Sequence, residues 1–352
     1  MRALLPPILM FTNLFAFPGL ADRIPVPPPI TPDMLDGMKE LPGGLNALPA
    51  IPSAIHSNQK GDLGKRLFFD TRLSLDGRTS CATCHNPDKA FTDGLPRSTG
   101  FQGAVLRRNA PTVLNAAYNQ AQFWDGRVTS LDEQCKTPLL SPTEMNMIDE
   151  HHLIDRLNRI PGYLSDFQSV FAGGPSLDNV ATAIAAFEQT LITADSPFDR
   201  YMKGDKNALS PSEKRGLILF FSKGACSECH KGVNFTDGEY HNLGDIPGSG
   251  APIDLGRFEV THQNSDIRAF KTPGLRNVAR TAPYMHDGAF ATLEEVIEFY
   301  DRGGDDTPNK STLIYKLNLT AGDKSDLLAF LKSLNGSLPQ IQNPQPYPDE
   351  QR

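Results

Sequence analysis

Two pentapeptides decide how this chain folds: Cys81-Ala82-Thr83-Cys84-His85 and Cys226-Ser227-Glu228-Cys229-His230. In each copy the two cysteines can form thioethers to one haem, and the histidine that follows can bind the haem iron. A zinc half-site or a redox Cys-x-x-Cys pair would not require a histidine directly after the second cysteine. The sequence therefore predicts two covalently bound c-type haems, held by Cys81, Cys84 and His85 and by Cys226, Cys229 and His230.

Composition supports a chain of two ordinary domains. The 352 residues are enough for two full hydrophobic cores. The formal net charge of −7 gives no reason to expect nucleic acid or an anionic membrane surface as a partner. Four of the five cysteines belong to the pentapeptides. The remaining one, Cys135, is interpreted as a small buried apolar residue in preference to a functional thiol.

The N-terminus predicts export. Residues 1–21 have the pattern of a cleavable signal peptide, with Arg2 before an apolar run and Gly19-Leu20-Ala21 as the cleavage site. No later run is long and apolar enough to span a bilayer. We therefore expect a periplasmic protein without membrane insertion, and covalent haem attachment outside the cytoplasm fits this location.

The periodicity along the chain predicts a mainly α fold with little strand. We expect a proline-rich extended arm over residues 22–53 and a polar, turn-rich junction at residues 196–210. Two cytochrome-c-like haem domains would then span residues 54–195 and 196–336, followed by a tail over 337–352. The predicted helices are 58–69, 151–159, 162–171, 177–191, a helix capped by Ser210, 293–300 and 321–334.

The two halves share more than the pentapeptides, which indicates internal duplication of one haem-binding unit. Matching pairs recur in the same order in both halves. They are Phe68-Phe69 and Phe220-Phe221, Phe91-Thr92-Asp93-Gly94 and Phe235-Thr236-Asp237-Gly238, and Trp124-Asp125-Gly126 and His286-Asp287-Gly288.

Extending this register assigns different roles to the two haems. Tyr300 stands fourteen residues after His286, and Pro138 stands fourteen residues after Trp124. A tyrosine can supply a phenolate ligand to iron, whereas proline has no donor atom. The register therefore predicts a closed haem at His230, ligated by Tyr300, and an open haem at His85.

Alternatives to these assignments remain open at this point. Tyr300 could be a surface residue of an amphipathic helix, and Met285 could be the second ligand, because Met/His pairs are common in cytochromes c. Three other histidines could also bind iron but are more often structural. Trp124 could be a core residue or an electron relay between the haems. The three histidines are His241, His262 and His286.

Residues 58–334 resemble the bacterial di-haem cytochrome c peroxidase and MauG family. The resemblance implies that the haem at His85 is peroxidatic and that the haem at His230 relays electrons. It also implies that Trp124 lies between the haems and that Gln134 and Glu144 belong to the distal pocket of the first haem, as catalytic residues.

The resemblance further implies a calcium ion between the haems. Its ligands would come from Asn109 and from the backbone carbonyls of Thr281 and Pro283. Such hard oxygen donors suit calcium.

Two departures point to the MauG-like branch of the family. Peroxidases that need reductive activation carry a distal histidine in the loop that corresponds to residues 100–103, which here contains none. They also have methionine where this chain has Tyr300, whereas MauG-like enzymes have tyrosine. A hard, anionic phenolate favours oxidised iron and would lower the potential of the second haem.

The sequence thus predicts a haem peroxidase that activates hydrogen peroxide at the open haem, shares the oxidising equivalents with the second haem and oxidises a protein partner. One alternative is a cytochrome c peroxidase that reduces peroxide to water with electrons from a small redox protein. An alternative outside enzymes is a dihaem electron carrier, which would need two six-coordinate irons. The absence of a donor atom in Pro138 argues against a carrier.

Overall fold

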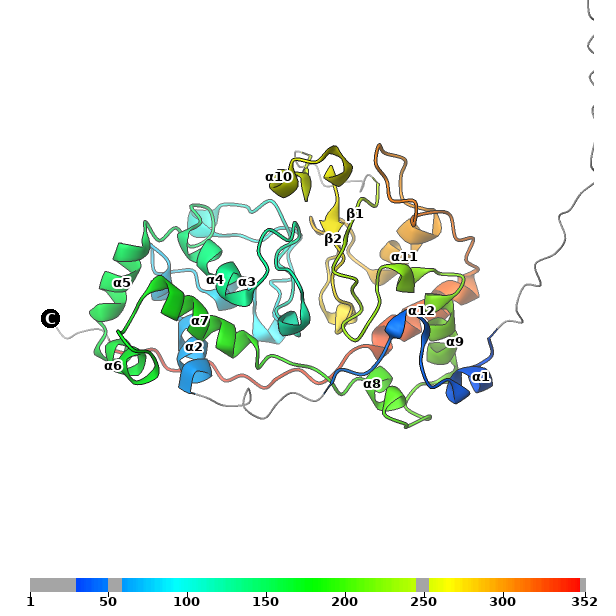
Figure 1. Ribbon diagram of the computed structural model, residues 1–352, viewed down its shortest axis with the longest axis horizontal. Helices are drawn as coiled ribbons and strands as arrows, with labels where there is room; N and C mark the ends of the chain where they lie inside the picture. Colours follow the sequence, from blue (N-terminus) through cyan, green and yellow to red (C-terminus); the bar gives the residue numbers. More distant parts are fainter. Residues whose placement is uncertain (1–29, 50–58, 245–252, 349–352) are drawn as a thin grey trace, which may run out of the picture. The chain divides into compact units, whose positions relative to one another are not determined.

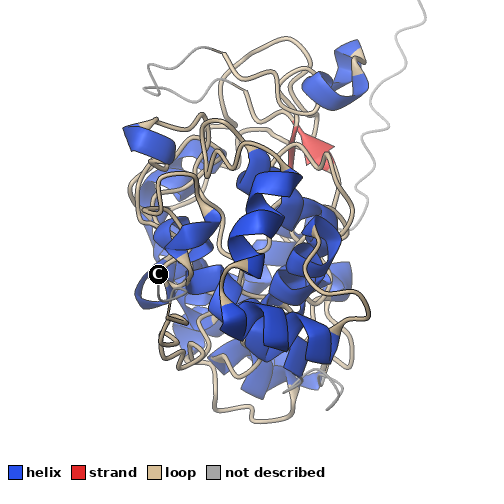
Figure 2. Ribbon diagram, turned by 90° about the vertical axis from the view of Figure 1, so that its left-hand side faces the viewer, coloured by secondary structure: helices blue, strands red, loops and turns tan. Residues whose placement is uncertain are grey.

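The structure is a computed structural model that describes residues 30–49, 59–244 and 253–348. Helices dominate the described part of the chain, and the only sheet found there consists of two short strands (Figure 2). The α-helices are α1 (Pro32–Gly37), α2 (Gln59–Phe69), α3 (Cys81–Cys84), α4 (Leu131–Leu140), α5 (Glu150–Asn158), α6 (Pro161–Val170), α7 (Leu177–Glu188), α8 (Pro197–Met202), α9 (Pro211–Phe221), α10 (Phe258–Thr261), α11 (Leu293–Asp301) and α12 (Ala321–Ser333).

Short 3₁₀ helices and one antiparallel strand pair connect these helices. Strand β1 (Tyr240–His241) pairs with β2 (Phe270–Lys271) so that Tyr240 lies opposite Lys271. None of the helices in the described ranges has the length and apolar character needed to cross a bilayer. The 3₁₀ helices are η1 (Pro42–Gly44), η3 (Thr71–Leu73), η4 (Pro87–Lys89), η5 (Phe101–Gly103), η6 (Ala116–Tyr118), η7 (Cys226–Glu228), η8 (Asn264–Asp266) and η9 (Val278–Arg280).

The mainly α prediction is confirmed, and each helix predicted from periodicity is present. The helices gather in two groups, α2 to α7 around the first pentapeptide and α8, α9, α11 and α12 around the second (Figure 1). We call these groups the first half and the second half. Helix α4 was not predicted, because Pro138 lies inside it and breaks the usual helical pattern.

Equivalent helix pairs build the core of each half. Helix α2 packs along α7 in the first half, and α9 packs along α12 in the second. Each pair is closely packed at a glycine, since a Cβ added at Gly64 would overlap the carbonyl oxygen of Ala183. A Cβ added at Gly216 would likewise overlap the carbonyl oxygen of Asp326. Because these glycines occupy the same place in both halves, the duplication inferred from sequence is also visible in the packing.

The backbone repeats as well. The Asn115 N–H donates to the Leu191 carbonyl over 2.9 Å, and the Asn277 N–H donates to the Leu334 carbonyl over 3.1 Å. Both asparagines have left-handed backbone conformations, and each is followed by a 3₁₀ helix, η6 or η9. These hydrogen bonds align α7 with α12 residue by residue, so that Leu191 corresponds to Leu334.

The segment before α2 differs from the extended arm that its prolines predicted. Residues 32–37 form helix α1, which Thr31 caps by accepting a hydrogen bond from the Met34 N–H. Leucines anchor this segment because their side chains are almost fully buried. These leucines are Leu35, Leu41, Leu45 and Leu48. Residues 1–29, which include the expected signal peptide, and residues 50–53 of the arm lie outside the described residues.

The predicted junction at residues 196–210 is also more ordered than a turn-rich linker. Ser196 and Asp199 form a capping box that starts α8. The i, i+3 pair Phe198 and Tyr201 faces inward, and Phe198 contacts the rings of Phe235 and Phe330. The segment was predicted to be a polar junction because the other face of this short amphipathic helix is polar.

The tail after α12 runs back to the first half (Figure 1). Tyr347 packs edge-on against Tyr163 with ring centroids 5.2 Å apart, and its hydroxyl donates to Asp166. Arg72 donates to the Tyr347 carbonyl over 2.9 Å. Residues 337–348 therefore act as a strap that contacts the first half. Residues 349–352 lie outside the described residues.

Candidate haem sites

The first pentapeptide forms the single turn α3 with its histidine at the C-terminal end. The Ser80 N–H donates to the Thr83 hydroxyl over 2.9 Å, which fixes the start of the turn. His85 Nδ1 lies 3.2 Å from the Phe91 carbonyl oxygen. Because a carbonyl can only accept, Nδ1 carries the hydrogen and Nε2 is left to bind a metal.

The second pentapeptide repeats this arrangement. His230 Nδ1 lies 3.0 Å from the Phe235 carbonyl oxygen, and Phe235, like Phe91, has a positive φ that turns this carbonyl toward the ring. Burial lowers the pKa of both imidazoles, which keeps them neutral. Both histidines are therefore in the tautomer and charge state that an iron ligand requires.

The second pentapeptide opens into a cavity of about 630 Å³. The cavity walls include Cys226, Cys229 and His230 on one side and the α11 residue Tyr300. Burial raises the pKa of the Tyr300 phenol, and the two neighbouring cysteines raise it further. Tyr300 thus lines the same cavity as the second pentapeptide, and its role as a haem ligand stays a prediction.

Lys271 provides an independent test of whether this cavity fits a haem. The residue is 8% exposed and lines the cavity, and no ion pair or hydrogen bond of its ammonium group is found among the described residues. Burial lowers its pKa to about 8, against the opposing effect of Asp237. A buried cation of this kind requires an anion nearby, and the propionate groups of a haem supply that charge. The cavity therefore fits haem c.

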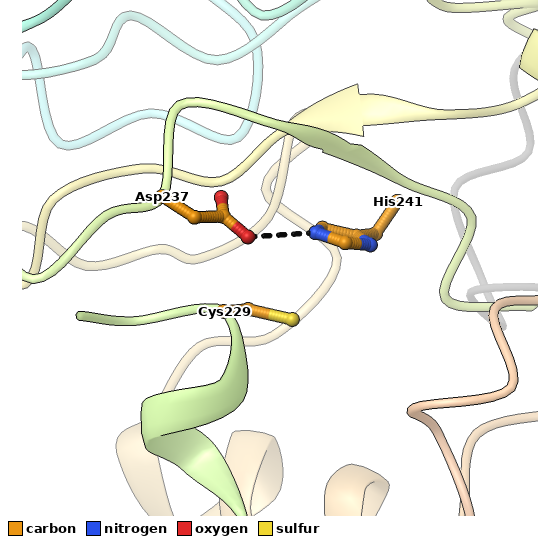
Figure 3. A group of neighbouring side chains, drawn as sticks. All are labelled: Cys229, Asp237 and His241. Atoms are coloured by element: carbon orange, nitrogen blue, oxygen red, sulfur yellow. Dashed lines mark hydrogen bonds and ion pairs between the residues drawn. The ribbon is translucent and has the colours of Figure 1, made fainter. Parts of the chain in front are cut away.

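Cys229, Asp237 and His241 lie together at the edge of this site (Figure 3). The His241 Nε2 forms an ion pair of 3.0 Å with the Asp237 carboxylate, which lowers the pKa of Asp237 against the effect of burial. Because Cys229 belongs to the pentapeptide, we assign this cluster to the surroundings of the second haem and not to a separate metal centre. The ion pair occupies the Nε2 atom by which His241 would have bound iron.

The other candidate ligands are also engaged or distant. The His286 ring stacks on Phe270 with centroids 3.7 Å apart. His262 is exposed at the end of α10. Met285 lines the same cavity as Tyr300 and so remains the alternative ligand.

Glu144 lies beside the first pentapeptide. Its carboxyl group interacts electrostatically with both Cys81 and Cys84. Burial raises the pKa of Glu144, while Arg127 and the Ser141 hydroxyl oppose the rise. The carboxyl group is therefore able to hold and release a proton close to the first haem site.

The loop that lacks a distal histidine is fixed to the turn that carries Glu144. The Phe101 N–H donates to the Thr143 carbonyl over 3.0 Å. A Cβ added at Gly100 would overlap that same carbonyl oxygen. The loop and the turn are thus in van der Waals contact, and only glycine fits between them.

Helix α4 carries Gln134 and Pro138 at the positions that Val296 and Tyr300 hold in α11. Both helices begin one residue after a hydroxyl cap, Ser130 or Thr292. Val296 lines the cavity of the second half. By this register Gln134 corresponds to Val296 and Pro138 to Tyr300, and the role of Gln134 stays a prediction.

Trp124 lies where the two halves meet. Its indole Nε1–H donates to the Asn109 carbonyl over 3.0 Å. Its own carbonyl accepts from the Lys271 N–H, and the Asn109 N–H donates to the His286 carbonyl, both over 2.7 Å. Asn109 and Lys271 are equivalent in the repeat, as are Trp124 and His286. The halves therefore exchange a reciprocal pair of backbone hydrogen bonds.

The residues expected to bind calcium all line the cavity described above. They are Asn109, Thr281 and Pro283. The Asn109 side chain donates from Nδ2 to the Leu95 carbonyl over 2.8 Å, which orients its amide group. The carbonyl and amide oxygens of these residues are of the type that calcium takes.

Comparison with known proteins identifies the family. Residues 58–207 match the family model of di-haem cytochrome c peroxidases. The cytochrome c551 peroxidase of Pseudomonas aeruginosa is 42% identical over 296 residues, which cover 82% of this chain and 82% of that protein. The chain belongs to the di-haem cytochrome c peroxidase and MauG family. Members of this family carry two haem c groups, and the chain is accordingly a haem peroxidase, so the electron-carrier alternative is set aside.

Relatives within the di-haem peroxidase family include both of its branches. The methylamine utilization protein MauG of Methylorubrum extorquens is 39% identical over 289 residues, or 82% of this chain and 81% of that protein. A crystal structure of a MauG-like protein associated with microbial copper homeostasis superposes with a TM-score of 0.74 at 35% identity, covering 84% of this chain and 95% of that one. Similarity to these relatives therefore does not distinguish the two branches.

Two buried residues of this di-haem peroxidase were missed by the sequence argument. Lys271 and Glu188 are both almost fully buried and titratable. Each stands out only when the two halves are aligned, because Lys271 corresponds to Asn109 and Glu188 to Leu331. Extending the repeat register past the pentapeptides would have found them.

Proposed function

We propose that this chain is a MauG-like di-haem peroxidase that is exported to the periplasm and uses hydrogen peroxide to oxidise a protein partner. The observation that carries the proposal is the contrast between Pro138 in α4 and Tyr300 in α11, at one register in two equivalent helices. When bound, the haem at His85 supplies an iron with an open position, and the haem at His230 supplies a second redox centre.

Glu144 is the residue that moves a proton during peroxide activation. Its electrostatic interaction with Cys81 and Cys84 supports this role, and burial keeps its pKa raised. It takes a proton from the near peroxide oxygen and returns it to the far one, which makes the far oxygen a better leaving group. Gln134 orients the peroxide by a hydrogen bond.

Trp124 carries oxidising equivalents between the halves. Its indole N–H and its backbone carbonyl are both fixed by residues that line the second cavity. A ring held in this way has little freedom to reorient. Its distances to the two haem sites then stay constant, which favours electron transfer. Arg127 covers the neighbouring Phe123 ring at 3.3 Å from its centroid, which further restrains this segment.

Tyr300 would hold the iron of the second haem through its phenolate oxygen. Burial raises the pKa of its phenol, so that ionisation requires the positive charge of the iron. Lys271 would hold the propionate side of the same haem. A calcium ion bound by Asn109, Thr281 and Pro283 would stabilise the contact between the halves next to Trp124.

Rapid mixing of the ferric protein with one equivalent of peroxide tests the proposal. The protein should react without prior reduction, because no histidine has to leave the first iron. The altered spectrum should then decay faster when an oxidisable protein is added. A reaction that proceeds only after partial reduction would contradict the proposal.

A cytochrome c peroxidase activity is the second candidate, supported by the similarity to the Pseudomonas aeruginosa enzyme. In that case a small redox protein would donate electrons, and peroxide would be reduced to water. Steady-state turnover with a reduced cytochrome or copper protein, at a rate higher than any oxidation of a protein substrate, would favour this function.

A further inference from the structure

A carboxyl group that the proposed function does not use is buried in the first half. Glu188, the last residue of α7, is 4% exposed. The Cys135 thiol points at one of its carboxylate oxygens from 4.0 Å, and Glu188 also interacts electrostatically with Cys81. No ion pair of Glu188 with a cation is found within the described ranges. A buried carboxyl group without a cation is stable only when it can keep a proton.

The repeat shows that this carboxyl group belongs to the wall of the first haem site. Alignment of Leu191 with Leu334 makes Glu188 equivalent to Leu331. Alignment of α4 with α11 makes Cys135 equivalent to Ile297. Both Leu331 and Ile297 line the second haem cavity.

The two haem walls therefore differ in a specific way. The second half presents two aliphatic side chains, whereas the first half presents a thiol and a carboxyl group at the same places. Helix α11 also contacts α12 in the second half, where the equivalent positions are held by isoleucine and leucine. The polar pair is thus a feature of the peroxidatic site alone.

We propose that Glu188 is the proton-holding group coupled to the redox state of the first haem. It takes up one proton from solvent when the haem attached to Cys81 accepts one electron from a reduced redox protein or a chemical reductant, and it returns that proton to solvent when the electron passes to an oxidant such as peroxide. The net charge of the buried site then stays constant, so neither redox state leaves an uncompensated charge next to Cys81. This inference goes beyond the proposed function, because it requires only the haem at Cys81 and Cys84.

The groups that face Glu188 are few and favour its protonated form. Asp132 and Cys135 face it from α4, and Cys81 faces it from α3. None of them is a cation, and Asp132 is held in place by the Thr182 hydroxyl over 2.8 Å. Burial, with a smaller contribution from Asp132, raises the pKa of Glu188 to about 8. A nearby ferric iron would lower this pKa, so proton exchange is expected around neutral pH.

Potentiometric titration of the holoenzyme at a series of pH values tests the proposal. The potential of the first haem, followed by its own optical or EPR signal, should fall as pH rises, with a slope of up to about 59 mV per pH unit for one proton per electron. In Glu188→Gln the potential of the first haem should no longer change with pH around neutrality. It should stay at the value that the wild-type haem has at low pH. The second haem, whose wall has Leu331, should not change its pH dependence.

Two controls separate coupling from a structural role. Asp132→Asn removes a negative neighbour of Glu188 and so lowers its pKa. The potential of the first haem should change with the same slope, but over a lower pH range. Glu133→Gln should keep the slope of the first haem, since Glu133 is exposed on α4. A Glu188→Gln protein with full haem content and an unchanged slope would overturn the proposal.

Infrared spectra of the wild type provide a test that needs no variant. Reduction of the first haem should produce a carboxylic acid C=O band that shifts in heavy water. The absence of such a band would also overturn the proposal.

Discussion

The Lys271 N–H donates a 2.7 Å hydrogen bond to the carbonyl oxygen of Trp124. Through this bond the tryptophan of the first half is joined to a residue whose side chain lines the haem cavity of the second half. The equivalent pair, Asn109 and His286, makes the same bond in the opposite direction. The halves are thus joined at two symmetric points, and only one of them carries an indole ring.

Replacing Trp124 by Phe should slow electron exchange between the haems while leaving peroxide binding intact. The variant loses the indole N–H that holds the ring on Asn109, but it keeps the backbone bond to Lys271. Stopped-flow spectra should show the first haem reacting at the normal rate and the second responding late. Simultaneous response of both haems in the variant would mean that Trp124 is not on the path.

Replacing Glu144 by Gln should reduce the rate of peroxide activation by roughly a hundred- to ten-thousand-fold, the usual effect of losing a positioned acid–base group. Glu144 must be ionised to take the first proton. The rate of peroxide activation by the wild type should therefore increase as the pH rises through the raised pKa of Glu144. The variant should lose this pH dependence. Glu133→Gln, at an exposed position one residue before Gln134, is a control that should leave the rate unchanged.

Replacing Tyr300 by Met should raise the potential of the second haem by about 0.1 V or more, within the roughly 0.8 V range that axial ligands span. Thioether favours reduced iron, whereas phenolate favours oxidised iron. Peroxide should still react at the first haem, while oxidation of a protein partner should fail. Met285→Leu is the matched control, and a shift in that variant alone would assign Met285 as the ligand.

Haem attachment can be tested by counting haems. Cys226→Ala should lose stable binding of one haem, and Cys135→Ala should keep both. The pyridine haemochrome assay measures this directly. One haem per chain in the wild type would be incompatible with two attachment sites.

The packing of the duplicated helix pairs predicts a stability difference between two glycines. Gly216→Ala should lower the free energy of unfolding by about 1–3 kcal/mol, because its Cβ would overlap the Asp326 carbonyl. Gly322→Ala in α12 meets only the Thr320 hydroxyl at 3.7 Å and should stabilise by up to about 1 kcal/mol. Thermal unfolding of the two holoproteins compares them. Equal changes in the free energy of unfolding would mean that α9 and α12 pack less closely at Gly216 than in this structure.

Local sequence motifs predicted the helices and the duplication well, and they are the basis of the predicted haem attachment sites. The pentapeptides fix chemistry within five residues, and the amphipathic helices depend on neighbours three or four positions away. Helix α8 was missed because its apolar face has only Phe198 and Tyr201. Helix α4 was missed because the presence of Pro138 disfavours a helix locally, and its packing against α7 overrides this preference.

The parts that could not be predicted depend on contacts between distant segments. The burial of Glu188 against Cys135 joins α7 to α4, and the bond between Lys271 and Trp124 joins the two halves. Periodicity carries no information about such pairs. The roles of Gln134, Glu144, Trp124 and Tyr300 and the calcium site stay predictions.

The central claim is that one iron is open and the other is closed by Tyr300. The EPR spectrum of the ferric holoenzyme tests it most directly, in the wild type and in Tyr300→Phe. We predict one high-spin and one low-spin haem in the wild type, and loss of the wild-type low-spin signal in the variant. Two low-spin haems in the wild type, or an unchanged spectrum in Tyr300→Phe, would contradict the claim.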